Sequence, residues 1–260
     1  MLFCAQEFDH YTPTTACLIQ DLLGLPVQCL AIDYNLGCSG FVYGLQLAKG
    51  LIEGTGVKNV LLLTSSCLTR TFNENDKSSR FIFGDGACAT LIGSREQNWG
   101  VDQFVFGTDG KGGERIIVKD GGARNPIQEH SFDDETDDYG NTSSRGHFYM
   151  NGTAIFVFGM RTVPKMIAEL LEKTTIEFDD IDVFVFHQAN QFMIETIRKK
   201  VGIPEEKFVV AMSHCGNTVS SSIPIALHEA MKEGKAKSGD KVLLAAFGVG
   251  LSWAGTIIQL

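Results

Sequence analysis

The feature that most constrains the fold of this chain is an internal repeat of alternating apolar segments. Residues 2–93 predict the order strand, helix, strand, helix, strand, strand, and residues 182–259 predict the same order. The run VLLLTS at 60–65 of the first repeat is equivalent in position to VLLAAF at 242–247 of the second. In the same way, ACATLIG at 87–93 is equivalent to WAGTIIQ at 253–259. Such alternation predicts an α/β fold with mixed, largely parallel sheets that helices cover on both faces. We therefore expect two pseudo-repeated halves, residues 1–98 and 99–260.

The two halves differ at their starts. The second half opens with an additional strand at 101–106 and a helix at 152–173, and the first half has no counterpart of this unit. We therefore expect an incomplete first half that lacks an N-terminal segment. Residues 111–145 are rich in Gly, Asp, Asn and Ser, which predicts a surface excursion between the halves.

A glycine-flanked cysteine, Cys38, lies in the stretch DYNLGCSG at 33–40. The apolar run at 29–32 reads as a buried strand, and residues 41–54 read as a helix buried on all sides. Cys38 would thus sit at a helix N-terminus, where free N–H groups and the helix dipole favour a thiolate nucleophile. The alternative is a buried structural cysteine, the commonest state of a free cysteine.

The repeat also predicts where two further polar residues lie. His187 follows the predicted strand 182–186, and Asn217 follows the predicted strand 208–212. Ligands of open α/β sheets bind at the carboxyl ends of strands, so Cys38, His187 and Asn217 should gather near one place. Taken singly, His187 could be a satisfied buried histidine and Asn217 a helix cap. Cys215 could face the same pocket as a second cysteine for proton transfer; the remaining cysteines read as core residues (Cys4, Cys17, Cys29, Cys67 and Cys88).

Composition excludes several classes of function. A net charge of −9 argues against a nucleic-acid-binding protein, which would present a basic face. Seven cysteines without a C-x-x-C pair predict neither a disulfide framework nor a metal site, and they suit a reducing, cytoplasmic compartment. No apolar run is long enough to cross a membrane, so we expect no membrane insertion.

Five motifs in order give the chain a resemblance to a known family. They are GCSG at 37–40, FGDGA at 83–87, HQAN at 187–190, GNT at 216–218 and FGVGLSW at 247–253. The chain resembles β-ketoacyl-acyl carrier protein synthase III, a thiolase-fold condensing enzyme. The resemblance implies a five-layered α-β-α-β-α fold, a homodimer, and decarboxylative condensation of an acyl primer with malonyl-acyl carrier protein through an acyl-cysteine. The substrates would be acyl-coenzyme A and the carrier-bound malonyl group, with no further cofactor.

The resemblance also implies roles for individual residues. Cys38 would be the nucleophile, and the backbone N–H groups of Cys38 and Val249 would form the oxyanion hole, although the family usually has glycine at the position of Val249. His187 and Asn217 would hold the enolate left by decarboxylation. Basic residues in the helix after HQAN would dock the acidic carrier protein (Arg198, Lys199 and Lys200). Cations at a helix C-terminus also have a simpler explanation, a favourable interaction with the helix dipole.

The chain departs from the family where substrates bind. Phe192 replaces an arginine that contacts coenzyme A or the carrier, and Lys77, with Arg80 nearby, aligns with another nucleotide-contacting arginine. Thr12, beside Tyr11, stands near the position of a gatekeeping aromatic residue. These changes leave the condensation chemistry in place and leave the primer open. Two alternatives therefore stand: an acyltransferase of a specialised pathway that does not decarboxylate, and an inactive truncated fragment.

Overall fold

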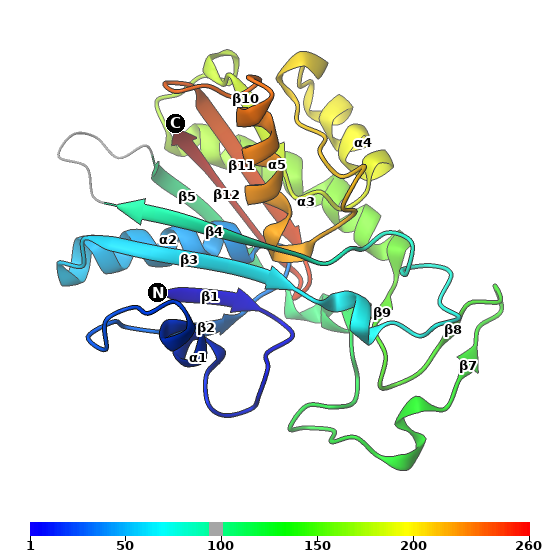
Figure 1. Cartoon of the computed structure of the whole chain (residues 1–260). Coiled ribbons are helices and arrows are strands. Elements are labelled where there is room, and N and C mark those ends of the chain that lie inside the picture. Colours follow the sequence, from blue (N-terminus) through cyan, green and yellow to red (C-terminus); the bar gives the residue numbers. More distant parts are fainter. Residues whose placement is uncertain (94–100) are drawn as a thin grey trace.

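The computed structural model describes residues 1–93 and 101–260, and two four-stranded sheets form its centre (Figure 1). The first sheet has the order β2-β1-β3-β4, with bounds Ile32–Asn35, Leu2–Ala5, Asn59–Ser66 and Gly86–Gly93. The second has the order β10-β11-β12-β5, with bounds Val183–Phe186, Lys241–Gly248, Ser252–Gln259 and Val101–Thr108. Both sheets are mixed, as alternating strands and helices predict.

The pairing pattern of one sheet recurs in the other. β1 pairs with β3 in parallel and β3 with β4 antiparallel, just as β10 pairs with β11 in parallel and β11 with β12 antiparallel. β5 adds a further antiparallel strand beside β12. No described strand pairs with the outer edge of β4. The predicted boundary between residues 98 and 99 lies outside the described residues.

In the described part of the chain, five α-helices separate and cover the sheets: α1 Thr15–Leu22, α2 Gly40–Thr55, α3 Gly152–Lys173, α4 Gln191–Val201 and α5 Ser222–Lys232. α2 contacts β1 and β3 on one side and β11 and β12 on the other, and α5 contacts both β4 and β10. α1 lies on the outer face of the first sheet, and α3, with α4 beside it, on the outer face of the second (Figure 1). The layers therefore follow the order α-β-α-β-α.

α2 is the helix that places Cys38. Its apolar side chains Phe41, Val42 and Ala48 are buried between the two sheets, and burial of such side chains is the main source of stability for a central helix. Gly44 lets the helix approach the first sheet closely, because a Cβ there would lie 2.7 Å from the Leu62 side chain. The second half of the helix reaches solvent, so the prediction of a helix buried on all sides is wrong there.

Three predicted strands differ from the observed ones. The strand expected at 29–32 is β2, three residues later, and it is partly exposed because it forms the edge of its sheet. The strand expected at 208–212 is reduced to a single bridge between Phe184 and Phe208. β4 begins at Gly86, one residue before the run expected at 87–93, and its residues alternate between more and less exposed ones, with Leu91 73% exposed.

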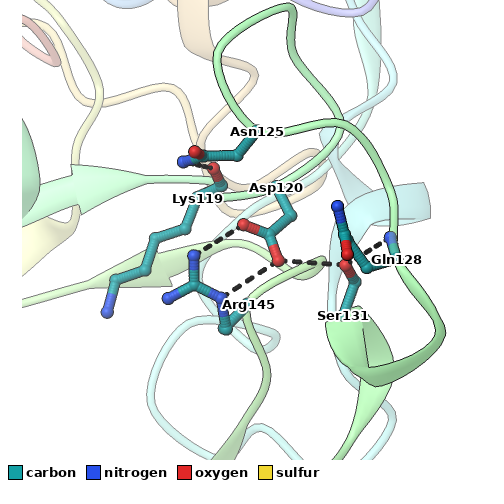
Figure 2. Close-up of polar contacts among 6 residues, drawn as sticks. All are labelled: Lys119, Asp120, Asn125, Gln128, Ser131 and Arg145. Carbon is teal, nitrogen blue, oxygen red and sulfur yellow. Dashed lines mark hydrogen bonds and ion pairs between the residues drawn. The ribbon is translucent and has the colours of Figure 1, made fainter.

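The excursion between the halves is more ordered than its composition suggests. It holds a short antiparallel pair, β7 (Glu135–Thr136) with β8 (Thr142–Ser143), and the strand β6 (Ile116–Ile117), which pairs with β9 (Tyr149–Met150) just beyond the excursion. Figure 2 shows its centre, the buried carboxylate of Asp120. Arg145 donates two hydrogen bonds to this carboxylate, at 3.0 and 2.8 Å, and the Ser131 hydroxyl donates a third at 2.9 Å.

These contacts pin three stretches of the excursion to one another. The Gln128 N–H donates to the Ser131 hydroxyl, and the Asn125 side chain donates to the carbonyl of Lys119 (Figure 2). Arg145 holds the pKa of Asp120 below its usual range, since a paired, hydrogen-bonded carboxylate keeps its charge. The excursion is thus fixed in one conformation next to the first sheet.

Among the described residues, no helix is long and apolar enough to span a membrane.

Candidate active site

Cys38 lies in the turn between β2 and α2, two residues before the helix begins. Its side chain is only 7% exposed and packs against Gly248 at the end of β11. A Cβ at Gly248 would lie 2.5 Å from the Cys38 sulfur, so the thiol can occupy this place only beside a glycine. Gly40 is similarly required, because a Cβ there would lie 2.3 Å from the sulfur of Cys4.

The expectation that the helix end lowers the pKa of Cys38 is wrong for this structure. Burial raises the pKa of the thiol to about 11, and the backbone N–H groups of Val249 and Cys38, which lower the pKa, offset this only in part. The cost of placing a thiolate in a dry site outweighs the favourable dipoles around it. The thiol is therefore neutral at physiological pH.

His187 follows β10 directly and is 1% exposed. Its backbone N–H donates to the carbonyl of Ala245 on β11, which fixes the main chain at this point. The ring nitrogen Nδ1 lies 2.6 Å from the hydroxyl of Ser222, the first residue of α5. Burial lowers the pKa of His187 to about 3, so the imidazole is neutral at physiological pH.

Asn217 is held by the first half of the chain. Its N–H donates to the Ile82 carbonyl at 2.9 Å, and its own carbonyl accepts from Gly84 N–H at 3.0 Å. The side-chain oxygen Oδ1 accepts a hydrogen bond from the Val219 N–H at 2.9 Å. Val219 has a φ of 53°, which is rare for a β-branched residue and costs about 1–3 kcal/mol. With Oδ1 engaged in this way, the amide nitrogen Nδ2 has no acceptor among the described residues and can donate to a ligand.

The structure brings these three side chains to one cavity of about 110 Å³. Cys38, His187 and Asn217 all line it, together with apolar residues such as Phe83, Ile155 and Phe247. The cavity holds one thiol nucleophile and two neutral N–H donors among apolar walls. It contains the parts needed to form a thioester and to stabilise negative charge on a thioester oxygen.

A second cavity, of about 480 Å³, adjoins the first. Ile116 lines both cavities, and Val249 lines the second while its neighbour Gly248 lines the first. Its walls combine apolar side chains with polar ones, which are Gln6, Glu7, Asn35, Thr71 and Asp120. Burial raises the pKa of Glu7, and its carboxylate accepts a hydrogen bond from the Cys67 N–H.

Two expectations for other cysteines are wrong. Cys215 does not line the cavity with Cys38, since its thiol contacts the carbonyls of Ala211 and Gly216. It is therefore not placed for proton transfer there. Cys17 is exposed on α1 instead of lying in the core.

One of the three residues expected to dock a carrier protein is not available. Arg198 is 8% exposed, and its guanidinium contacts Glu195 at 2.7 Å and the carbonyl of Ile203 at 3.0 Å. These contacts close the C-terminal end of α4, so Arg198 has a structural role. Lys199 is exposed, and Lys200 lies beside Arg161 and Lys165 of α3 around a shallow surface pocket.

The residues that depart from the family pattern lie on the surface. Phe192 is 73% exposed and stacks on Phe156, with ring centroids 5.7 Å apart. The Tyr11 hydroxyl donates to the carbonyl of Gly121 and so ties the loop before α1 to the excursion. Lys77 is exposed, and the Arg80 guanidinium donates to the carbonyl of Glu74.

Three residues of the site were not identified from the sequence. Ser222 contacts His187, Val219 orients Asn217, and Gly248 makes room for the Cys38 sulfur. The only signal for Ser222 was its place in a run of three serines before a predicted helix, which does not tell one serine from the next.

Comparisons with known proteins identify the family of the chain. The profile of 3-oxoacyl-(acyl-carrier-protein) synthase III matches residues 32–110, and that of its C-terminal part matches residues 171–260. A beta-ketoacyl-(acyl-carrier-protein) synthase III of Clostridium perfringens is 37% identical over 252 residues, which cover 97% of this chain and 74% of the relative. That of Campylobacter fetus is 33% identical and covers 99% of this chain and 76% of the relative.

Solved structures give the same result. A crystal structure of a 3-oxoacyl-(acyl-carrier-protein) synthase III superposes with a TM-score of 0.98 and 44% identity, covering 100% of this chain and 77% of that one. The Thermus thermophilus beta-ketoacyl synthase III superposes with a TM-score of 0.86 and 33% identity, covering 100% and 76%. The predicted five-layered thiolase-like fold is thereby confirmed. The chain belongs to the 3-oxoacyl-(acyl-carrier-protein) synthase III family of condensing enzymes, which are acyltransferases.

Proposed function

We propose that the protein joins an acyl group to a malonyl thioester in two stages, with Cys38 carrying the acyl group between them. The observation that supports this most directly is the shared cavity of Cys38, His187 and Asn217, in which the side-chain oxygen of Asn217 is already engaged. The site then offers N–H donors to a substrate oxygen and a sulfur nucleophile to a carbonyl carbon.

In the first stage the Cys38 sulfur attacks the carbonyl carbon of an acyl thioester. The backbone N–H groups of Cys38 and Val249, which already act on the Cys38 sulfur, are the donors for the oxygen that becomes negative. The carbon–sulfur bond to the leaving thiol breaks, and this thiol takes up the proton that Cys38 loses. The acyl group remains on Cys38.

In the second stage a malonyl thioester enters with its thioester oxygen toward His187 and Asn217. Loss of carbon dioxide leaves an enolate, whose oxygen accepts hydrogen bonds from the two side chains. An amide cannot protonate the carbanion, and neither can an imidazole whose pKa is about 3. The carbanion attacks the acyl carbon, the bond from this carbon to the Cys38 sulfur breaks, and the sulfur takes up a proton from solvent. The product is a β-ketoacyl thioester.

Release of carbon dioxide tests this function against its closest alternative. The purified protein, given an acyl-coenzyme A and malonyl-acyl carrier protein, should release one carbon dioxide for each β-ketoacyl product, and Cys38→Ala should form no product. Acyl transfer to Cys38 without carbon dioxide release would instead indicate an acyltransferase that does not decarboxylate. Failure to acylate Cys38 would indicate an inactive chain.

We propose that the second cavity receives the acyl chain of the primer. It begins at Val249, next to the sulfur that carries the acyl group, and apolar side chains such as Leu68 and Phe148 line part of it. The partly buried carboxyl of Glu7 makes a long alkyl chain unfavourable there, because burying a polar group against hydrocarbon is costly. A short acyl-coenzyme A is the primer we expect, and Glu7→Leu should shift the preference toward longer chains.

The carrier protein would dock beside the mouth of the first cavity. Lys199 and Lys200, with Arg161 and Lys165 in place of the buried Arg198, give positive charge there to a chain of net charge −9. Opposite charge steers an acidic partner toward the site. Lys199→Glu/Lys200→Glu should slow turnover of carrier-bound malonyl groups while acylation by a small thioester stays the same. Equal loss with both substrates would exclude docking at this surface.

We further propose that the protein is a homodimer. β2 is an edge strand whose first residue, Ile32, is exposed, and exposed apolar residues of α1 and the following loop precede it (Leu22, Leu23, Val27 and Leu30). An apolar surface next to an unpaired strand edge is typical of an interface. Light scattering should give twice the chain mass, and Ile32→Lys/Val27→Lys should reduce it to one chain. We expect the dimer to work in the cytoplasm, on thioester substrates alone.

A further inference from the structure

The contact between Ser222 and His187 decides which ring nitrogen of the histidine carries its proton. Oγ of Ser222 and Nδ1 of His187 are 2.6 Å apart, and both side chains are buried, at 2% and 1% exposure. One hydrogen lies between these two atoms. It belongs either to the hydroxyl, which then donates to Nδ1, or to Nδ1, which then donates to the hydroxyl.

The surroundings of the hydroxyl favour the first arrangement. In the described part of the chain, Ser222 Oγ has one other polar neighbour, the Gln188 backbone N–H at 3.4 Å. An N–H group cannot accept a hydrogen bond, so His187 Nδ1 is the acceptor available to the hydroxyl proton. If Nδ1 carried the proton instead, the buried hydroxyl hydrogen would have no acceptor, which is unfavourable.

The position of Gln188 strengthens this argument. Its side chain donates to the carbonyl of Phe186 at 2.7 Å and accepts from the Ala211 N–H at 2.9 Å. Gln188 is therefore held at both ends, and its backbone N–H stays directed at Ser222. The Ser222 hydroxyl therefore accepts a hydrogen bond from the Gln188 N–H and donates one to Nδ1 of His187.

We infer that Ser222 is a positioning residue that keeps the proton of neutral His187 on Nε2. Nε2 has no partner among the described residues, and His187 lines the cavity. An Nε2–H group donates to the enolate oxygen, whereas a bare Nε2 would repel it. The same tautomer prevents His187 from accepting the proton of Cys38, so Ser222 makes the histidine a donor for the malonyl stage only. The kinetic part of this inference rests on the proposed function, and the tautomer itself does not.

The experiment compares three variants of the whole protein. Ser222→Ala removes the hydroxyl, Ser222→Thr keeps it, and Ser221→Ala is the matched control. Ser221 is equally buried and adjacent, but its hydroxyl contacts Thr64 and Gly86 instead of His187. Each variant is labelled with ¹⁵N-histidine, and ¹H–¹⁵N spectra at pH 7 identify the protonated ring nitrogen, with His187→Gln to assign its signals. Acylation of Cys38 and carbon dioxide release from the malonyl thioester are measured separately.

The wild type and Ser221→Ala should show protonated Nε2 and unprotonated Nδ1, and Ser222→Ala should show a mixture of tautomers. Carbon dioxide release should fall about 10–100-fold in Ser222→Ala and recover in Ser222→Thr, with acylation within about twofold of wild type, as expected when an orienting partner is lost. Protonated Nδ1 in the wild type, or an unchanged tautomer in Ser222→Ala, would overturn the inference. So would a shifted tautomer with unchanged carbon dioxide release. A wild type that releases no carbon dioxide would refute the proposed function but leave the spectroscopic result decisive for the tautomer.

Discussion

Replacing Gly248 by alanine tests whether the place of the Cys38 sulfur is as tightly fixed as the structure indicates. The new Cβ would lie 2.5 Å from that sulfur and 2.6 Å from the Cys38 Cβ, whereas ordinary contacts begin at 3.4 Å. The thiol must therefore move by almost 1 Å. A shift of about 1 Å in a reacting group costs on the order of 100-fold in rate, and crowding a packed site costs about 1–3 kcal/mol of stability.

Intact-mass spectrometry follows this effect, because it counts the acyl groups on Cys38 over time. Gly50→Ala is the matched control. It adds the same methyl group to α2, the helix that follows Cys38, where the structure has nothing within 4 Å. We expect Gly50→Ala to acylate like wild type and to be more stable by about 1 kcal/mol, the usual gain for Gly→Ala within a helix. Acylation of Gly248→Ala within about threefold of wild type, in a folded protein, would refute the packing argument.

Three further predictions concern charge and burial. Because the pKa of Cys38 is about 11, its alkylation by iodoacetamide should accelerate roughly tenfold per pH unit from pH 7 to 10. A plateau of the alkylation rate below pH 9 would contradict the raised pKa. At pH 7, peptide mapping should find the exposed Cys17 alkylated before Cys38. The folded-state pKa of His187, about 3, lies below the ordinary value of 6.5, so the unfolded chain binds more protons between these two pH values. The contribution of this histidine to stability is therefore lost as the pH falls from 6.5 toward 3. Urea titrations should show that the free energy of unfolding loses up to about 1.4 kcal/mol per pH unit from this group, and His187→Gln should lack this part of the pH dependence. Asp120→Asn should weaken the contacts with Arg145 and speed proteolysis within residues 111–145. The control Asp138→Asn, which changes an exposed residue of the same excursion, should not speed proteolysis. Equal cleavage of both variants would show that the buried carboxylate does not order the excursion.

The sequence predicts the parts of the fold that depend on local pattern. The long apolar runs of β3 and β11 and the helix α2 appear where they were expected, because buried strands and helices need continuous apolar segments. β2 was expected three residues too early, since an edge strand carries fewer apolar residues and has a weaker pattern. The segment after Phe208 has the composition of a strand but finds only one bridging partner, which no local pattern can reveal.

The candidate site shows the same limit. Motifs point to Cys38, His187 and Asn217, and the repeat explains why they converge. The pKa of Cys38 was expected in the wrong direction, because the amount of desolvation depends on residues such as Gly248 that are far away in the chain. Arg198 looks like part of a basic surface patch, yet its partners Glu195 and Ile203 bury it. Contacts between distant segments decide each of these cases, and composition and spacing do not encode them.

We propose that Cys38 carries the acyl group while His187 and Asn217 serve only the malonyl stage. The most direct test measures two rates, carbon dioxide release and Cys38 acylation, in Asn217→Ala and in His187→Ala, and compares each rate with that of the wild type. Both variants should acylate Cys38 at close to the wild-type rate and release carbon dioxide on the order of 10²–10³ times more slowly, the usual loss for one donor to a developing negative charge. Normal carbon dioxide release by either variant, or equal loss of both rates, would contradict the assigned roles.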